Sequence, residues 1–163
     1  MQDVDIRLAT SVDAESIADA HMDSIRSLGS LFYAANIIEA WEGLRECSTY
    51  VRAMERGVTF FIATESETGK VIGFSSETVH ENKHRIAVFV RGSNARQGIG
   101  GTLFRRAEEH AVQQRAESIH ISASIGAVQF YERMGFVNDG DGEHALANGN
   151  KMACVFMHKN LVN

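Results

Sequence analysis

The most constraining feature of the sequence is a segment in which a strand pattern leads through a glycine-rich loop into a helix pattern. β-Branched and aromatic residues alternate over 86–90, which favours a strand. Apolar residues then recur at helical spacing from Leu103 to Ala111. The first N–H groups of a helix have no partner within it and favour negative charge, and glycine lets a backbone approach a phosphate closely. The segment therefore predicts an anion site between a strand and a helix.

The spacing of the glycines distinguishes three kinds of phosphate-binding loop. Gly92 and Gly98 are one residue too far apart for the loop of P-loop nucleotide-binding proteins, and Ile99 stands where that loop needs lysine. Gly98 and Gly100 fit the start of a dinucleotide fingerprint, but Leu103 occupies its third glycine position. The same two glycines match a third pattern, Arg/Gln-x-x-Gly-x-Gly/Ala after an apolar-aromatic-valine strand. A helix start with glycines kept for packing is the alternative interpretation.

A second motif lies one helix and one strand further along the chain. Residues 127–136 read Ala-Val-Gln-Phe-Tyr-Glu-Arg-Met-Gly-Phe. In this order, the two motifs resemble the GNAT superfamily of acetyl-CoA-dependent N-acetyltransferases, and within it a small bacterial-type branch of unknown substrate. The resemblance covers nearly the whole chain. Two positions depart from the family pattern, since Ala95 replaces an Arg or Gln and Gly126 replaces an Asn that often precedes the second motif.

The resemblance implies a single acetyltransferase domain over residues 1–163 with the α/β (α+β) GNAT fold. Its sheet is mixed and mostly antiparallel, with about six or seven strands, helices on both faces, and a splay between the central strand and its parallel neighbour. The chain's own patterns predict a first helix that follows a capping box of Thr10 and Asp13, carries Ile17, His21, Ile25 and Leu28 on one stripe and ends at Gly29. Further helices are predicted over 37–44, with Leu44 on the apolar face, and over 48–56, 102–114 and 127–134. Strands are predicted over 5–9, 58–65, 71–79, 86–90 and 118–122, with a last hairpin of 136–138 and 151–158 around a Gly/Asp/Asn-rich loop at 139–150.

The resemblance also implies roles for particular residues. Backbone groups of 88–90 would bind the pantetheine arm of acetyl-CoA and offer an N–H to the developing oxyanion. Tyr131 would protonate the leaving thiolate, since a phenol of pKa about 10 suits a thiolate of similar basicity; its alternative role is a packed helix aromatic. The cofactor-binding set implied is Val88, Phe89, Val90, Ala95, Arg96, Gln97, Gly98, Ile99, Gly100, Gly101, Thr102, Phe130 and Tyr131.

The sequence leaves the general base open. His84, at the start of the central strand, is the candidate that we place in the catalytic set beside Tyr131. Glu77 on the preceding strand, His21 on the first helix and a bound water are the other candidates. A histidine on an apolar helix stripe is more often a hydrogen-bonded core residue, and one in a polar turn is more often solvated.

Two functions from other classes remain open. One is a regulatory module that binds acyl-CoA without turnover, which the departures at Ala95 and Gly126 would suit. The other is a zinc hydrolase, because His80, Glu81 and His84 spell His-Glu-x-x-His. That motif needs a helix to put both histidines on one face, whereas here a polar turn between strands is predicted. We therefore expect no metal.

The composition of the chain limits the kinds of partner that it is expected to bind. The net charge is −5 and the basic residues are scattered, which argues against nucleic acid. No apolar run approaches the ~20 residues of a membrane span, and the start of the chain does not resemble a signal peptide. Cys47 and Cys154 are expected to be buried free thiols in a cytoplasmic protein. The expected partner is a small-molecule or peptide amine, with a homodimer left open. The charge would steer cationic amines but is too small to select an acceptor.

Overall fold

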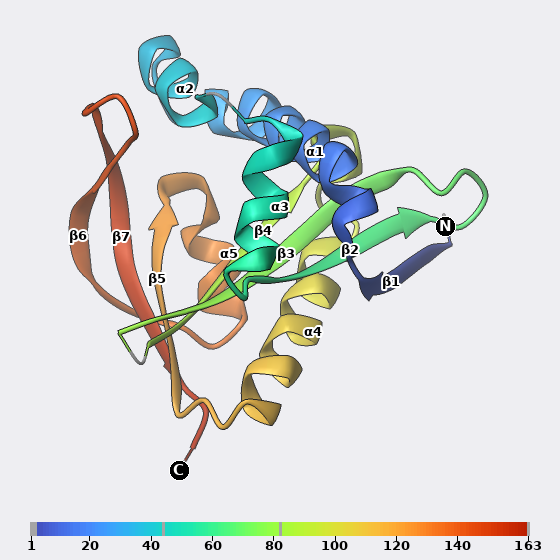
Figure 1. Ribbon diagram of the computed structural model, residues 1–163. Helices are drawn as coiled ribbons and strands as arrows, with labels where there is room; N and C mark the ends of the chain where they lie inside the picture. The colour runs from blue at the N-terminus through green and yellow to red at the C-terminus, as the bar shows by residue number, and fades with distance from the viewer. Residues whose placement is uncertain (1–2, 44, 82, 163) are drawn as a thin grey trace.

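Seven strands of the described chain form one sheet, in the order β1-β2-β3-β4-β5-β7-β6 (Figure 1). The computed structural model describes residues 3–43, 45–81 and 83–162. The strands are β1 (Val4–Leu8), β2 (Thr59–Glu65), β3 (Val71–His80), β4 (Lys83–Val90), β5 (Ser118–Ser124), β6 (Val137–Ala145) and β7 (Lys151–Asn160). The helices are α1 (Ala14–Leu28), α2 (Ala35–Glu42), α3 (Cys47–Glu55), α4 (Ile99–Gln113) and α5 (Val128–Arg133). The predicted α/β fold class is confirmed.

Helices cover both faces of the sheet, and an apolar cluster fills each interface. Along β2 the side chains alternate: Phe61 and Ala63 join the cluster under α4, whereas Phe60 and Ile62 join the cluster under α1 and α3. We call these two sides the α4 face and the α1 face. Strand residues paired across the sheet share a face, so the register assigns the other side chains to one face or the other.

The start of α1 follows the predicted capping pattern. The Asp13 carboxylate accepts a hydrogen bond from the N–H of Thr10 (2.9 Å) and two from the Arg7 guanidinium (2.9 and 2.8 Å). The Arg7 bonds lower the pKa of Asp13, which counters the effect of burial. Ile17, His21 and Ile25 of the predicted stripe are buried, and Leu28 is partly buried. Leu44, expected on the apolar face of the second helix, lies outside the described residues.

The central strand β4 and its parallel neighbour β5 separate. Over 83–90 and 118–124 their ladder contains one pair, His84 with Ile119, near the N-terminal ends of both strands. Beyond this pair the two strands diverge toward their C-terminal ends, whereas β4 keeps its full antiparallel ladder with β3. The predicted splay is therefore confirmed, and it leaves one edge of β4 without a strand partner from 85 onward.

The last hairpin is longer than the sequence predicts. The interpretation of 139–150 as a loop was wrong for 139–145, because β6 continues to Ala145 and pairs with β7 along its length. Gly142 makes room for a ring, because a Cβ there would lie 2.1 Å from the Phe156 ring. Gly140 has φ +120° and lies at the register shift opposite Phe156, where glycine supplies the backbone conformation.

Hydrogen bonds connect the turn after β4 to α1. The Arg91 side chain is buried, donates from Nε to the carbonyl of Val71 (2.7 Å) and from Nη2 to the Asp19 carboxylate (2.6 Å). The N–H of Gly92 donates to the carboxylate of Asp23 (2.9 Å). These bonds hold the segment that leads to the glycine loop against the first helix.

We expect Gly92→Ala to destabilise the fold by about 1–3 kcal/mol, because a Cβ at Gly92 would lie 2.4 Å from the Cβ of Ser27. Urea denaturation measures the loss. The double variant Gly92→Ala/Ser27→Gly removes the opposing atoms and should be close in stability to Ser27→Gly alone. If Gly92→Ala lowers the free energy of unfolding equally in the wild-type and the Ser27→Gly backgrounds, the contact between positions 92 and 27 does not limit packing.

Candidate active site

The glycine loop and the start of α4 form an open surface rich in backbone N–H groups. Gly98, the N-cap of α4, has φ +84°, and Arg96 has φ +60°. A Cβ at Gly98 would meet nothing within 4 Å, so the outer side of the loop is free. The helix begins at Ile99, earlier than the Thr102 start predicted, because the left-handed residue at Gly98 initiates it. The first N–H groups of this 15-residue helix are available to an anion.

A cavity of about 540 Å³ opens above this surface, and we call it the glycine-loop cavity. Three arginines line it, Arg96, Arg105 and Arg133, and none of its lining residues in the described chain is acidic. The cavity therefore suits a ligand with several negative charges. Of the predicted cofactor-binding set, it is lined by Val88, Phe89, Val90, Ala95, Arg96, Gly98, Gly100, Gly101, Phe130 and Tyr131.

Three members of the predicted set do not line this cavity. Ile99 is buried in the cluster under α4. The Gln97 side chain donates back to the carbonyl of Ser93 (3.3 Å), and the Thr102 hydroxyl donates to the carbonyl of Gly98 (3.1 Å). The Gln97 and Thr102 side chains hold the loop and Ile99 packs in the core. Only the backbone groups of these three residues are left for a ligand.

The segment between α1 and α2 supplies a wall that the sequence did not predict. The Tyr33 hydroxyl donates to the carbonyl of Ala153 on β7 (2.6 Å) and accepts from the N–H of Ile125 (2.8 Å). This segment therefore spans the gap between the first helices and the far strands. Other lining residues missed from sequence are Leu28, Leu31, Phe32, Asn94, Arg105, Gln129 and Arg133. Of these residues, only Arg105 could have been predicted from the sequence, because it lies one helical turn after Gly101.

The departure at Gly126 has a steric reason. A Cβ at this position would lie 2.5 Å from the Phe32 ring, and both residues line the glycine-loop cavity. The ring of Phe32 thus occupies the space that a side chain at 126 would need. Where the family pattern has asparagine, this chain therefore combines glycine at 126 with the ring of Phe32 from the segment between α1 and α2.

A second cavity, of about 330 Å³, lies on the α1 face beside β4, β5 and β7, and we call it the strand cavity. The two cavities meet where β4 and β5 separate. Their shared lining residues are Trp41, Val88, Phe89, Ser124, Ala127 and Tyr131. A ligand in one cavity would therefore contact a ligand in the other at this junction.

Tyr131 lies at the junction with its ring in the core. The side chain is 6% exposed and packs edge-on against Phe104, Phe130 and Phe136. Burial raises the pKa of Tyr131 to about 12, and a backbone hydrogen bond with Val88 partly opposes the rise. The hydroxyl is therefore protonated at neutral pH and sits at the free edge of β4, so it can act as a proton donor.

The acetyltransferase (GNAT) domain family matches residues 33–159 of the chain. The chain belongs to the GNAT acetyltransferase family. Its structure resembles a GCN5-related N-acetyltransferase from Rhodopseudomonas palustris (TM-score 0.85, 24% identity, 99% of this chain and 98% of that chain covered). No curated protein sequence matches the chain.

Two further acetyltransferase structures share the fold. One is the PaiA N-acetyltransferase of Thermoplasma acidophilum in complex with coenzyme A (TM-score 0.74, 17% identity, 97% of this chain and 99% of that chain covered). The other is YncA of Salmonella typhimurium, a putative acetyltransferase with its cofactor acetyl-CoA (TM-score 0.77, 16% identity, 99% and 95% covered). The GNAT fold, including the splayed β4 and β5, therefore extends over nearly all of this chain.

In this GNAT protein, His21 lies in the wall of the strand cavity. Its side chain is 6% exposed, and its Nδ1 is hydrogen-bonded to the Tyr50 hydroxyl (2.9 Å). Its Nε2 is buried and has no hydrogen-bond partner among the described residues. Burial, and to a lesser extent the charge of Arg45, hold the pKa of His21 well below the usual 6.5. A neutral imidazole with a free nitrogen thus borders the cavity.

His84 lies elsewhere, on the α4 face. Its Nδ1 bonds to one carboxylate oxygen of Glu77 (2.8 Å), and the Nδ1 of His110 on α4 bonds to the other (2.6 Å). Glu77 is 3% exposed. None of the three residues lines either cavity. The structure therefore brings His84 and Glu77 together but does not bring them to Tyr131, so we do not propose either as the base.

The His-Glu-x-x-His segment is a hairpin, not a helix. His80 ends β3 and pairs with Lys83, whereas His84 pairs with Val79, so the two imidazoles lie on opposite faces of the sheet. Among the described residues, no group of three His, Cys, Asp or Glu side chains could hold a metal ion. This geometry does not support the zinc alternative. The described helices include none long and apolar enough to cross a membrane.

Proposed function

We propose that the protein is an N-acetyltransferase that moves an acetyl group from acetyl-CoA directly to an amine. The meeting of two cavities at Tyr131 and Val88 is the observation that carries this proposal. Direct transfer needs two substrates held in contact, and two cavities with a common wall provide that arrangement.

The glycine-loop cavity fits acetyl-CoA as the cosubstrate. The amides at the start of α4, with the open surface at Gly98, suit the diphosphate. Arg96, Arg105 and Arg133 supply positive charge that compensates for Ala95. Acetyl-CoA supplies the activated acetyl group, and the free edge of β4 supplies backbone groups for the pantetheine arm. The coenzyme A and acetyl-CoA complexes of the Thermoplasma and Salmonella proteins support this assignment.

The residues at the junction divide the chemistry between them. The carbonyl oxygen of the thioester gains negative charge as the C–N bond forms, and a backbone N–H within 88–90 stabilises it. As the C–S bond breaks, Tyr131 donates its proton to the sulfur. In the tautomer whose Nδ1–H donates to the Tyr50 hydroxyl, the Nε2 of His21 holds a lone pair and accepts a proton from the amine nitrogen directly or through water. Solvent restores the proton of Tyr131 and removes that of His21, which completes the balance.

We expect His21→Gln to lower kcat by about 100-fold while the KM for acetyl-CoA stays unchanged. Steady-state kinetics measure both. Because the pKa of His21 lies well below 6.5, its imidazole remains neutral at that pH, and wild-type kcat at saturating amine should not lose half its value there. His80→Gln, on the exposed hairpin tip, is the matched control and should retain wild-type kcat. Equal kcat for both variants would remove His21 from the mechanism.

Coenzyme A release on mixing protein, acetyl-CoA and a panel of amines tests the proposal. Release with at least one amine, together with mass-spectrometric detection of the acetylated product, is the expected result. Tight binding of acetyl-CoA with no release for any amine would favour the regulatory module without turnover. Failure to bind acetyl-CoA would contradict the proposal as a whole.

We further propose a cytoplasmic protein of one domain that acts on small-molecule or peptide amines. The continuous sheet from β1 to β6 supports a single domain. Cys154 is buried as predicted, but Cys47 is exposed, which corrects the expectation that both thiols are buried. An exposed free thiol suits a reducing compartment.

A further inference from the structure

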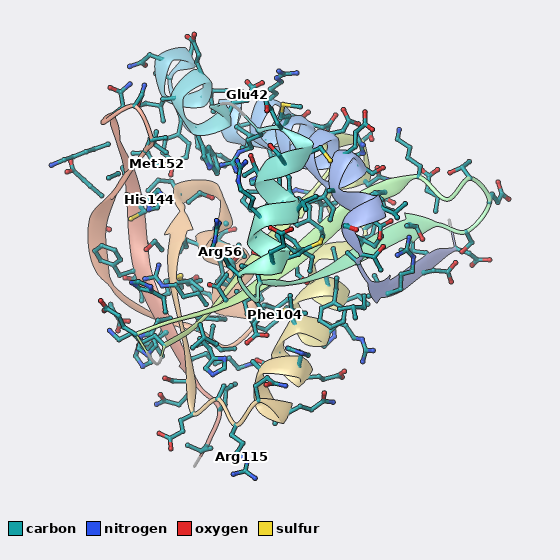
Figure 2. All side chains as sticks on the ribbon, viewed as in Figure 1. Glu42, Arg56, Phe104, Arg115, His144 and Met152 are labelled. Atoms are coloured by element: carbon teal, nitrogen blue, oxygen red, sulfur yellow. The ribbon has the colours of Figure 1, made fainter. Side chains whose placement is uncertain are left out.

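The wall of the strand cavity is cationic, although the chain carries a net charge of −5. Two arginines and three histidines line the cavity: His21, Arg45, Arg85, His120 and His144. Figure 2 labels His144 on β6, which pairs with Met152 on β7 at the outer side of this cavity. None of its lining residues in the described chain is Asp or Glu. A cavity of this kind disfavours a polyamine and favours an anion.

Arg45 is partly buried and, unlike the buried Arg91, has no acidic partner among the described residues. Arg91 is paired with Asp19. Arg45 has no described carboxylate within 4.0 Å, and its Nε is buried without a hydrogen-bond partner. A guanidinium that keeps a buried donor unused has unmet capacity for a carboxylate.

Arg45 lies next to the junction of the two cavities. Its Nη2 donates to the carbonyl of Trp41 (3.1 Å), and Trp41 lines both cavities. Its charge also acts on His21, and both its charge and a side-chain hydrogen bond act on Tyr50. Arg45 and His21 therefore line the same part of the strand cavity, next to Trp41 and the junction where the amine must meet the thioester.

The far end of the cavity adds positive charge. Arg85 precedes Val88 by three residues, so it lies roughly 10 Å along β4 from the junction. The pKa of His120 is lowered by burial and then by the charge of Lys83, and Arg85 lowers it further. Arg45 and Arg85 thus place positive charge both near the junction and farther along β4.

We propose that the acceptor is an amine that also carries a carboxylate, such as a free amino acid. Arg45 binds the carboxylate while the amino group faces His21 and the junction, and Arg85 attracts a second acidic group of longer substrates. This inference rests on the proposed acetyltransferase function and names the substrate class of that site. A peptide amino terminus lacks the adjacent carboxylate and would not use Arg45 in this way.

The test compares free amino acids with their carboxamides and with diamines, using coenzyme A release. We expect kcat/KM at least about 10-fold higher for amino acids than for the matching carboxamides. Arg45→Gln should raise the KM for amino acids about 10- to 100-fold, with kcat and the KM for acetyl-CoA unchanged. Arg45→Lys, which keeps the charge but loses the fork, should be intermediate.

Arg56→Gln is the matched control, because Arg56 ends α3 outside both cavities (Figure 2) and its loss changes the net charge equally. Its KM values should equal those of the wild type. Turnover of diamines or carboxamides in preference to amino acids, or an unchanged KM in Arg45→Gln, would overturn this inference and leave the acetyltransferase proposal standing. Absence of turnover with every amine would contradict the acetyltransferase proposal instead.

If no amine is turned over, a binding measurement still tests the role of Arg45. Amino acids titrated into wild-type protein saturated with coenzyme A should release heat on binding, and Arg45→Gln should bind at least about 10-fold more weakly. No binding by the wild type, or equal binding by both proteins, would overturn the assignment of Arg45.

Discussion

Tyr131→Phe should lower kcat by about 100-fold or more while the affinity for acetyl-CoA remains within about twofold of wild type. The change removes one oxygen atom from a side chain whose ring is otherwise packed among aromatic residues. The pKa of about 12 keeps the wild-type phenol protonated throughout the neutral range. The basic limb of the wild-type kcat profile should therefore lie above pH ~10, the value for a free tyrosine.

Steady-state kinetics and calorimetric titration with acetyl-CoA separate the two roles of Tyr131. If the residue only packs the core, Tyr131→Phe should turn over at the wild-type rate, because the ring remains. If it also shapes the binding surface, the affinity for acetyl-CoA should fall together with kcat. Only a loss of kcat with affinity retained agrees with proton donation to the leaving sulfur.

Glu77→Leu should destabilise the fold by about 3 kcal/mol. The buried carboxylate accepts from His84 and His110 at once, and leucine would leave both imidazoles without their acceptor inside the protein. Urea denaturation measures the loss. Glu109→Leu, on the exposed side of the same helix that carries His110, is the matched control and should change stability by no more than about 0.5 kcal/mol.

The same variant examines the base that the sequence favoured. At a temperature where Glu77→Leu remains folded, its kcat should be close to wild type, because the cluster of Glu77, His84 and His110 lies on the α4 face, outside both cavities. A large fall in kcat of the folded variant would restore His84 as a catalytic candidate.

The glycine loop and the sheet were predictable because they depend on local spacing. The pattern of Gly98 and Gly100 after an apolar strand identified the loop, and the helix that follows buries its predicted stripe. The hairpin was misjudged at Gly140 and Gly142, because glycine usually signals a turn. Here Gly142 accommodates the Phe156 ring of the partner strand β7, and Gly140 adopts φ +120° at the register shift, neither of which composition reveals.

The acceptor side was less predictable, since it depends on contacts between distant elements. The sequence placed His84 ahead of His21 as the base, and only the register of β3 and β4 shows that His84 faces α4. The net charge suggested cationic substrates, whereas Arg45 and Arg85 give the strand cavity the opposite preference. The charge of a site depends on which side chains line it, and the net charge of the whole chain does not predict it.

The separation of β4 from β5 couples folding to ligand occupancy. Backbone groups on the free edge of β4 lack the neighbour that a continuous sheet would provide, so water satisfies them until a ligand chain arrives. A ligand that completes this edge adds to the stability of the folded state by mass action, about 2.7 kcal/mol at one hundred times its dissociation constant. The sheet lacks a strand along this edge, and a ligand chain bound there would complete it.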